Sequence, residues 1–296
     1  MKIRSTAVGA AAAAAALAAT LVPHPNATAS AHPAARWSAT WASAMQSPVP
    51  GNDTTDPKGP NWSDGFSNQT VRQVIRVSGG GTRNTVVTFG DSITNGHNST
   101  VGGNDRYPDA LAGRLALARR PLAVANSGIS GNTLLNGLAC FGEKGITRFR
   151  RDALGQPGVR TVIFGEGTND IWDSEGKFGG CGQTPRITAD QLIAGYQTLI
   201  RAAHARGVRI IGATIIPFKA PYMSPADFLR AEAIRDQVNH WIRTSGAYDA
   251  VADFAKAVAD PADPEELNPA YNSGDFLHPN DAGYRAIAAT IKPNEL

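Results

Sequence analysis

From residue 85 onward, short apolar runs alternate with longer stretches of helical periodicity. The runs predict strands at 86–88, 122–125, 160–164, 208–216 and 250–251, with an earlier edge strand at 70–77. The periodic stretches predict helices at 107–118, from a capping box at 188–191 to Gly207, at 224–244 and at 280–291. Strands separated by helices of this length are typical of an α/β fold, in which a parallel sheet is covered on both faces.

Polar segments that contain glycine follow three of these strands, and a further polar segment precedes the last helix. They are 89–96, 126–133, 165–170 and 275–279. Because right-handed crossovers place the carboxyl ends of parallel strands at one edge of the sheet, we expect all four segments to meet there. Ligands bind at this edge in open α/β sheets.

Ser92, in the first of these segments, is a candidate nucleophile, which needs a base and an oxyanion site. Asp275 and His278 are three residues apart, so on a helical turn the carboxylate could orient the imidazole toward Ser92. The backbone N–H of Ser92, the backbone N–H of Gly131 and the side-chain amide of Asn169 are candidate oxyanion donors. His97 lies near Ser92 in sequence but has no carboxylate at a comparable offset.

The ordered set of segments resembles the conserved blocks of the SGNH (GDSL) hydrolase family. The resemblance implies a flavodoxin-like three-layer α/β/α fold and an esterase or lipase that needs no metal or other cofactor. It also implies that Ser92 is the nucleophile, His278 the base, Asp275 its orienting carboxylate, and Ser92, Gly131 and Asn169 the oxyanion hole. The segments that carry it are Gly90-Asp91-Ser92, Ile129-Ser130-Gly131-Asn132-Thr133, Gly167-Thr168-Asn169-Asp170 and Asp275-Phe276-Leu277-His278-Pro279.

The N-terminal part predicts export. Lys2 and Arg4 precede an alanine-rich apolar run, and small residues typical of a cleavage site follow, so residues 1–31 are interpreted as a signal peptide. Residues 32–84 form an extension with a short strand and a glycine-rich linker, and residues 85–296 the catalytic domain. The extension resembles secreted bacterial members of the family but lacks most of the β-rich region that precedes their catalytic domain.

The charge, the hydropathy and the cysteine content bear on possible partners and on a disulfide. The formal net charge is +3, and no Lys/Arg run stands out, so nothing favours nucleic-acid binding. No stretch after the leader is apolar and long enough to anchor the chain in a membrane. Cys140 and Cys181 are the only cysteines, and in an exported chain such a pair predicts a disulfide; the alternative is two free thiols.

The leading hypothesis is a secreted, extracellular, monomeric serine esterase or lipase that acts on carboxylic esters through an acyl-enzyme. The second is a carbohydrate esterase, of deacetylase or feruloyl type, whose substrate is an acylated polysaccharide. The third is a carbohydrate-binding protein without catalytic activity, against which the intact Ser92, Asp275 and His278 argue. The sequence does not distinguish small-molecule from polysaccharide substrates.

Overall fold

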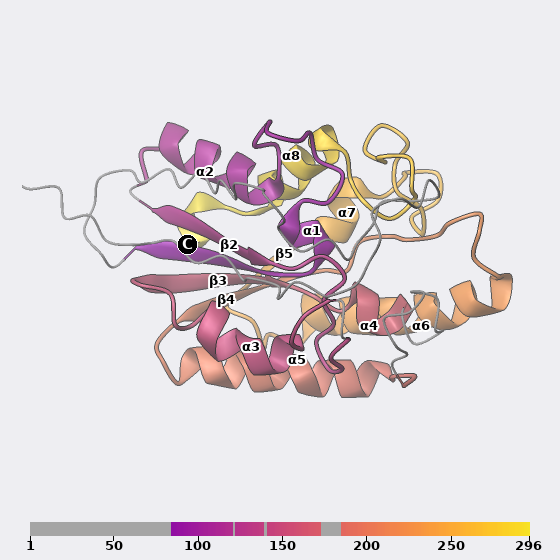
Figure 1. Cartoon of the computed structure of the whole chain (residues 1–296), viewed down its shortest axis with the longest axis horizontal. Helices are drawn as coiled ribbons and strands as arrows, with labels where there is room; N and C mark the ends of the chain where they lie inside the picture. The colour runs from indigo at the N-terminus through magenta and orange to yellow at the C-terminus, as the bar shows by residue number, and fades with distance from the viewer. Residues whose placement is uncertain (1–83, 121, 139–140, 173–184) are drawn as a thin grey trace, which may run out of the picture. The chain divides into compact units, whose positions relative to one another are not determined.

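The computed structural model describes residues 84–120, 122–138, 141–172 and 185–296. Their centre is a parallel five-stranded sheet in the order β2-β1-β3-β4-β5 (Figure 1). The α/β fold class predicted from the sequence is therefore confirmed. The strands are β1 (Thr85–Gly90), β2 (Ala123–Gly128), β3 (Val159–Gly165), β4 (Arg209–Ala213) and β5 (Ala250–Ala252).

Helices cover both faces of this sheet (Figure 1). One face carries α1, α2, α7 and α8, and the other carries α3, α4, α5 and α6. Each face has its own apolar core, because neighbouring strand residues such as Val86 and Val87 point to opposite sides and are both fully buried. The helices are α1 (Ser92–Asn95), α2 (Tyr107–Leu117), α3 (Gly145–Asp152), α4 (Thr168–Trp172), α5 (Ala189–His204), α6 (Pro225–Thr244), α7 (Phe254–Val258) and α8 (Asp281–Thr290), with a short 3₁₀ turn at Pro293–Glu295.

Strand β1, which lies between β2 and β3, ends level with both of these neighbours. Gly90 pairs in register with Gly128 of β2 and Gly165 of β3. A Cβ on Gly90 would overlap the carbonyl oxygen of Gly165, and one on Gly128 would overlap the backbone at Asn95. Gly128 therefore lets the backbone of α1 pack directly on the end of β2, and Gly90 leaves room for the side chain of Thr94. Since the chain turns from β2 on one side of β1 to β3 on the other, Ser92 lies at the topological switch point.

Local capping explains why the longer helices start where the sequence predicts. Thr188 and Gln191 form the reciprocal capping box of α5, and Ser224 caps α6 with Pro225 at its first position. Asn280 caps α8 by accepting a hydrogen bond from the N–H of Gly283. These three helix starts are confirmed.

The strand bounds differ from the predicted ranges, and the structure gives the reason for two of them, β2 and β4. Strand β2 continues beyond the predicted end at 125 through Asn126–Gly128. The backbone of these residues still pairs with β1, although their side chains are polar or absent. Strand β4 ends at Ala213, although the apolar run goes on to 216. Beyond it, Asn239 of α6 accepts from the N–H of Ile215 and donates to its carbonyl, so a side chain replaces the strand ladder.

Several sequence predictions fall outside the described residues and stay predictions. They are the signal peptide, the extension with its strand at 70–77, and the disulfide between Cys140 and Cys181. Among the described residues, no helix combines the length and apolar character that crossing a membrane requires.

Candidate active site

Ser92 is held at the tip of β1 by the start of a short helix. The sequence predicts a polar loop here, whereas the structure has one helical turn, α1, with Ser92 as its first residue. Asp91 caps this turn: its Oδ1 accepts from the N–H of Ile93 at 3.0 Å. Gly96 ends the turn with a φ of +89°, a left-handed conformation suited to glycine. The serine is thereby fixed at the predicted edge of the sheet.

The structure brings Ser92, His278 and Asp275 together in one hydrogen-bonded chain. Ser92 Oγ lies 2.8 Å from His278 Nε2, and His278 Nδ1 lies 2.6 Å from Asp275 Oδ2. Both Ser92 and His278 are buried. This is the order of atoms in which a carboxylate orients an imidazole and the imidazole accepts a serine proton.

A bend in the backbone, and not the helical turn expected from the sequence, brings the side chains of Asp275 and His278 together. Asp275 Oδ1 accepts from the N–H groups of Leu277 (3.0 Å) and His278 (2.7 Å), which folds the segment around the carboxylate. Phe276, between them, has a φ of +63°. The carboxylate thus fixes both the backbone and the imidazole of His278.

The chain just after α1 also reaches the carboxylate of Asp275. Asn98 Nδ2 donates to Asp275 Oδ2 at 2.8 Å, and Ser273 Oγ donates to Oδ1 at 3.2 Å. Partial burial would raise the pKa of Asp275, but the hydrogen bonds and charge of His278 outweigh it and hold that pKa far below its usual range. Asp275 is therefore an ionised acceptor throughout the neutral range.

His97 contacts His278 although its sequence context gave no reason to expect this. The two ring centroids are 4.3 Å apart with planes tilted by 59°. Burial, and then the nearby His278, lower the pKa of His97 to about 4, so its ring is neutral at physiological pH. The only signal in the sequence was its position five residues after Ser92.

Three side chains that can bind metal ions also meet at this place. Within the described ranges, the one group of imidazole and carboxylate atoms close enough to share a cation is His97, Asp275 and His278, all within 4.8 Å of one another. Both oxygens of Asp275 already accept hydrogen bonds, one of them from the His278 imidazole. The arrangement therefore fits an orienting carboxylate better than a metal ligand set.

The two remaining predicted residues, Gly131 and Asn169, lie in neighbouring segments at the same edge. Gly131 has a φ of +74°, and a Cβ there would overlap the ring of Phe141, so this position requires glycine. Asn169 is buried in α4, and its Nδ2 donates to the carbonyl of Asn132 at 2.9 Å. That bond uses one of the two amide hydrogens and ties α4 to the segment that carries Gly131.

Two acidic residues beside Asn169 are structural. Glu166 and Asp170, which the sequence left open as supporting residues or an exposed rim, are both buried. Asp170 accepts from the N–H groups of Leu134 (2.6 Å) and Leu135 (2.9 Å), so it anchors the segment after Gly131. Burial raises the pKa of each of these two carboxyls to about 7.

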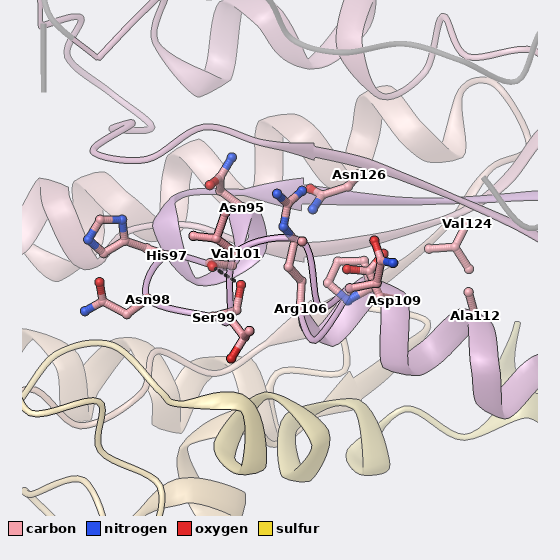
Figure 2. Close-up of a pocket in the computed structure, with 15 residues that line it drawn as sticks. Asn95, His97, Asn98, Ser99, Val101, Arg106, Asp109, Ala112, Val124 and Asn126 are labelled. Carbon is pink, nitrogen blue, oxygen red and sulfur yellow. Dashed lines mark hydrogen bonds between the residues drawn. The ribbon is translucent and has the colours of Figure 1, made fainter. Parts of the chain in front are cut away.

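A polar cavity of about 300 Å³ lies between α2, β2 and the segment that follows α1. Figure 2 shows Asn95, Arg106 and Asn126 gathered in its middle and His97 and Asn98 at one end. Ser92 does not line it. Because His97 also contacts His278, the cavity adjoins the candidate site without covering the serine.

Solved structures with this architecture include several hydrolases. A G-D-S-L family protein from Desulfitobacterium hafniense aligns with a TM-score of 0.52 and 18% identity, over 72% of this chain and all of that one. The acetylxylan esterase of Geobacillus stearothermophilus aligns at 0.51 and 22%, over 71% and 93%. Another acetyl xylan esterase aligns at 0.51 and 21%, over 70% and 96%. At these identities the likeness establishes the fold.

Family membership comes from the sequence profile of the GDSL-like lipase/acylhydrolase family, which matches residues 88–286. That span contains every one of the predicted site residues, from Ser92 to His278. A comparison with curated protein sequences gives no significant match. The matched span is well over half of the chain, and the fold agrees with it. This chain therefore belongs to the GDSL-like lipase/acylhydrolase family.

Proposed function

We propose that this protein is a secreted serine esterase that hydrolyses carboxylic esters through an acyl-enzyme on Ser92. The observation that carries the proposal is the chain from Ser92 Oγ through His278 to Asp275, with distances of 2.8 and 2.6 Å. Hydrogen-bond contact between nucleophile, base and orienting carboxylate is the geometry that serine activation needs.

In the first half of the reaction, His278 Nε2 takes the proton of Ser92 while Oγ bonds to the ester carbonyl carbon. The carbonyl oxygen becomes an oxyanion, and Asp275 stabilises the imidazolium at Nδ1. The bond to the alcohol oxygen then breaks, and His278 donates its proton to that oxygen. The products are the free alcohol and an acylated Ser92.

In the second half, water attacks the acyl carbon while His278 Nε2 accepts its proton. The new tetrahedral intermediate expels Ser92 Oγ, which recovers the proton from His278, and the carboxylic acid leaves. In both halves we assign the oxyanion to the N–H of Ser92, the N–H of Gly131 and the amide of Asn169. As the first residue of α1, Ser92 has an N–H that the helix itself does not use.

Hydrolysis of p-nitrophenyl esters from acetate to palmitate tests this function. The wild-type protein should hydrolyse at least the short esters, and Ser92→Ala should abolish turnover. Ser245→Ala, an exposed serine at the end of α6, is the matched control and should keep wild-type rates. Equal rates for wild type and Ser92→Ala would rule out the proposed nucleophile.

A carbohydrate esterase is the second candidate. Two observations favour it: the polar cavity beside His97 offers amide and guanidinium groups to a hydroxylated alcohol, and two proteins of similar fold are acetyl xylan esterases. In this case kcat/KM for acetylated xylo-oligosaccharides should exceed that for p-nitrophenyl acetate. The reverse order would favour a simple esterase, and inactivity on both, with binding to the oligosaccharide, a non-catalytic binding protein.

Export is part of the same proposal. The basic start, the apolar run and the small residues before Ser30 and His32 support removal of a signal peptide. N-terminal sequencing of protein recovered from the culture medium should therefore begin at one of these two residues. Protein that stays with the cells and begins at Met1 would argue against export.

A further inference from the structure

Arg148 of α3 is the largest fully buried side chain among the described residues, and the mechanism above makes no use of it. A buried guanidinium is costly unless every part of it is paired. Its sequence neighbours Arg150 and Arg151 are both exposed, so burial singles out one arginine of the three.

The guanidinium donates to three acceptors at the carboxyl edge of the sheet. Nη2 donates to the carbonyl of Gly90 at 2.9 Å, at the end of β1 and two residues before Ser92. Nη1 donates to the carbonyl of Ser127 at 2.8 Å, near the end of β2. Nε donates to the side-chain oxygen of Asn132 at 2.7 Å, next to Gly131. One rigid group therefore joins the nucleophile strand to the segment of a proposed oxyanion donor.

Asn132 extends this connection to the third strand end. Its side-chain Nδ2 donates to the main-chain carbonyls of Phe141 (2.8 Å) and Glu143 (3.0 Å). Its main-chain carbonyl accepts from the side-chain amide of Asn169. The position of the Asn169 amide thus depends on Asn132, and the orientation of Asn132 depends on Arg148.

Two carboxyl groups lie close to the Arg148 guanidinium. Glu166 Oε1 lies 3.5 Å from Nη2, and Asp152 Oδ2 lies 3.7 Å from Nη1. The guanidinium carbon also lies 3.8 Å from the centre of the Phe89 ring. Only a planar group with donors in several fixed directions meets all of these partners, so lysine is a poor replacement.

We propose that Arg148 is a positioning residue that holds Asn132, and through it Gly131 and Asn169, in register with Ser92. This rests on the proposed serine-esterase function. Oxyanion donors act mainly on the transition state, so their misplacement lowers kcat and leaves KM nearly unchanged. A residue that only stabilised the fold would change the unfolding midpoint without this kinetic signature.

The test compares Arg148→Met and Arg148→Lys with Arg151→Met, its exposed neighbour on α3, which pairs with Glu143 and Asp152. Rates on p-nitrophenyl acetate are measured well below the unfolding midpoint of each protein. We expect both Arg148 variants to lose kcat by about 10- to 100-fold, somewhat less than removal of an oxyanion donor, with KM within about threefold. Arg151→Met should keep both constants.

Asn132→Ala and the double variant Asn132→Ala/Arg148→Met complete the test. If Arg148 acts through Asn132, the single changes lower kcat alike and the double change lowers it little further. If Arg148→Met does not fold, Asn132→Ala and Arg148→Lys still test the proposal, because each should lower kcat while KM stays nearly unchanged.

Folded Arg148 variants with wild-type kcat, or losses that multiply in the double variant, would overturn this proposal alone. Wild-type protein with no ester hydrolysis and no fluorophosphonate adduct on Ser92 would instead overturn the proposed function, and this proposal with it.

Discussion

Replacing Asp275 by asparagine keeps the shape of the side chain and changes one oxygen to an NH₂ donor. In the native site Oδ2 accepts from His278 Nδ1 (2.6 Å) and from Asn98 (2.8 Å), while Oδ1 accepts from two backbone N–H groups at 3.0 and 2.7 Å. Whichever way the new amide turns, its NH₂ faces donors. Turned toward His278, it forces the imidazole to carry its proton on Nε2.

A proton on Nε2 removes the acceptor that Ser92 Oγ needs 2.8 Å away. A carboxylate-to-amide change that imposes the wrong tautomer in a serine hydrolase lowers kcat by about 10⁴-fold, equivalent to about 5 kcal/mol in activation free energy. We expect a loss of this size for Asp275→Asn. Asn98→Ala removes a single donor and leaves the tautomer intact, so its loss should be about tenfold or less.

The assay is the initial rate of p-nitrophenyl acetate hydrolysis at saturating substrate, with circular dichroism to confirm that both variants are folded. A folded Asp275→Asn variant that retains more than about a tenth of wild-type kcat would refute the idea that Asp275 sets the His278 tautomer. A similar loss in Asn98→Ala would refute it as well, because that change does not affect the tautomer.

Three further predictions concern other parts of the molecule. Gly131→Ala combines a φ of +74° with overlap on Phe141, so it should destabilise the fold by about 2 kcal/mol or more and lower kcat; unchanged denaturant midpoints would contradict this. Burial raises the pKa of Glu166 from 4.5 to about 7, so the protonated acid favours the fold and its stabilisation, up to about 3 kcal/mol, is lost as pH rises from 5 to 8. Asp170 titrates in the same window, so Glu166→Gln should reduce, but not abolish, the fall of the unfolding free energy with pH; an unchanged slope would exclude Glu166 as a contributor. Non-reducing mass spectrometry should find Cys140 joined to Cys181, with two alkylatable thiols as the opposing result.

Much of the site could be predicted because its chemistry follows the strand order. Ser92, Gly131 and Asn169 each follow a strand of a parallel sheet, and strand ends meet at one edge whatever the details of the helices. The proposed base, His278, and its proposed orienting carboxylate, Asp275, could be paired because they are close in sequence. The structure places these residues as expected, even though the local bend around Phe276 is not a helical turn.

The roles of Arg148 and Asp170 could not be predicted from the sequence. Both roles depend on whether the side chain is buried, and the hydrophobic pattern does not indicate burial at these positions. Arg148 lies close in sequence to Arg150 and Arg151, and only the packing of α3 shows which of the three is inside. Asp170 next to Asn169 could equally have been a surface residue. The short helices α1, α4 and α7 have four or five residues each, too few for a periodic pattern to appear.

The central claim is that Ser92 is a nucleophile activated by His278, and covalent labelling tests it most directly. The wild-type protein is incubated with a fluorophosphonate, digested and mapped by mass spectrometry, beside Ser92→Ala, His278→Ala and the control Ser245→Ala. We expect a stoichiometric adduct on Ser92 in wild type and control, none in Ser92→Ala, and labelling slowed by at least about 10³-fold in His278→Ala. An adduct on another residue, or labelling of Ser92 at the wild-type rate without His278, would contradict it.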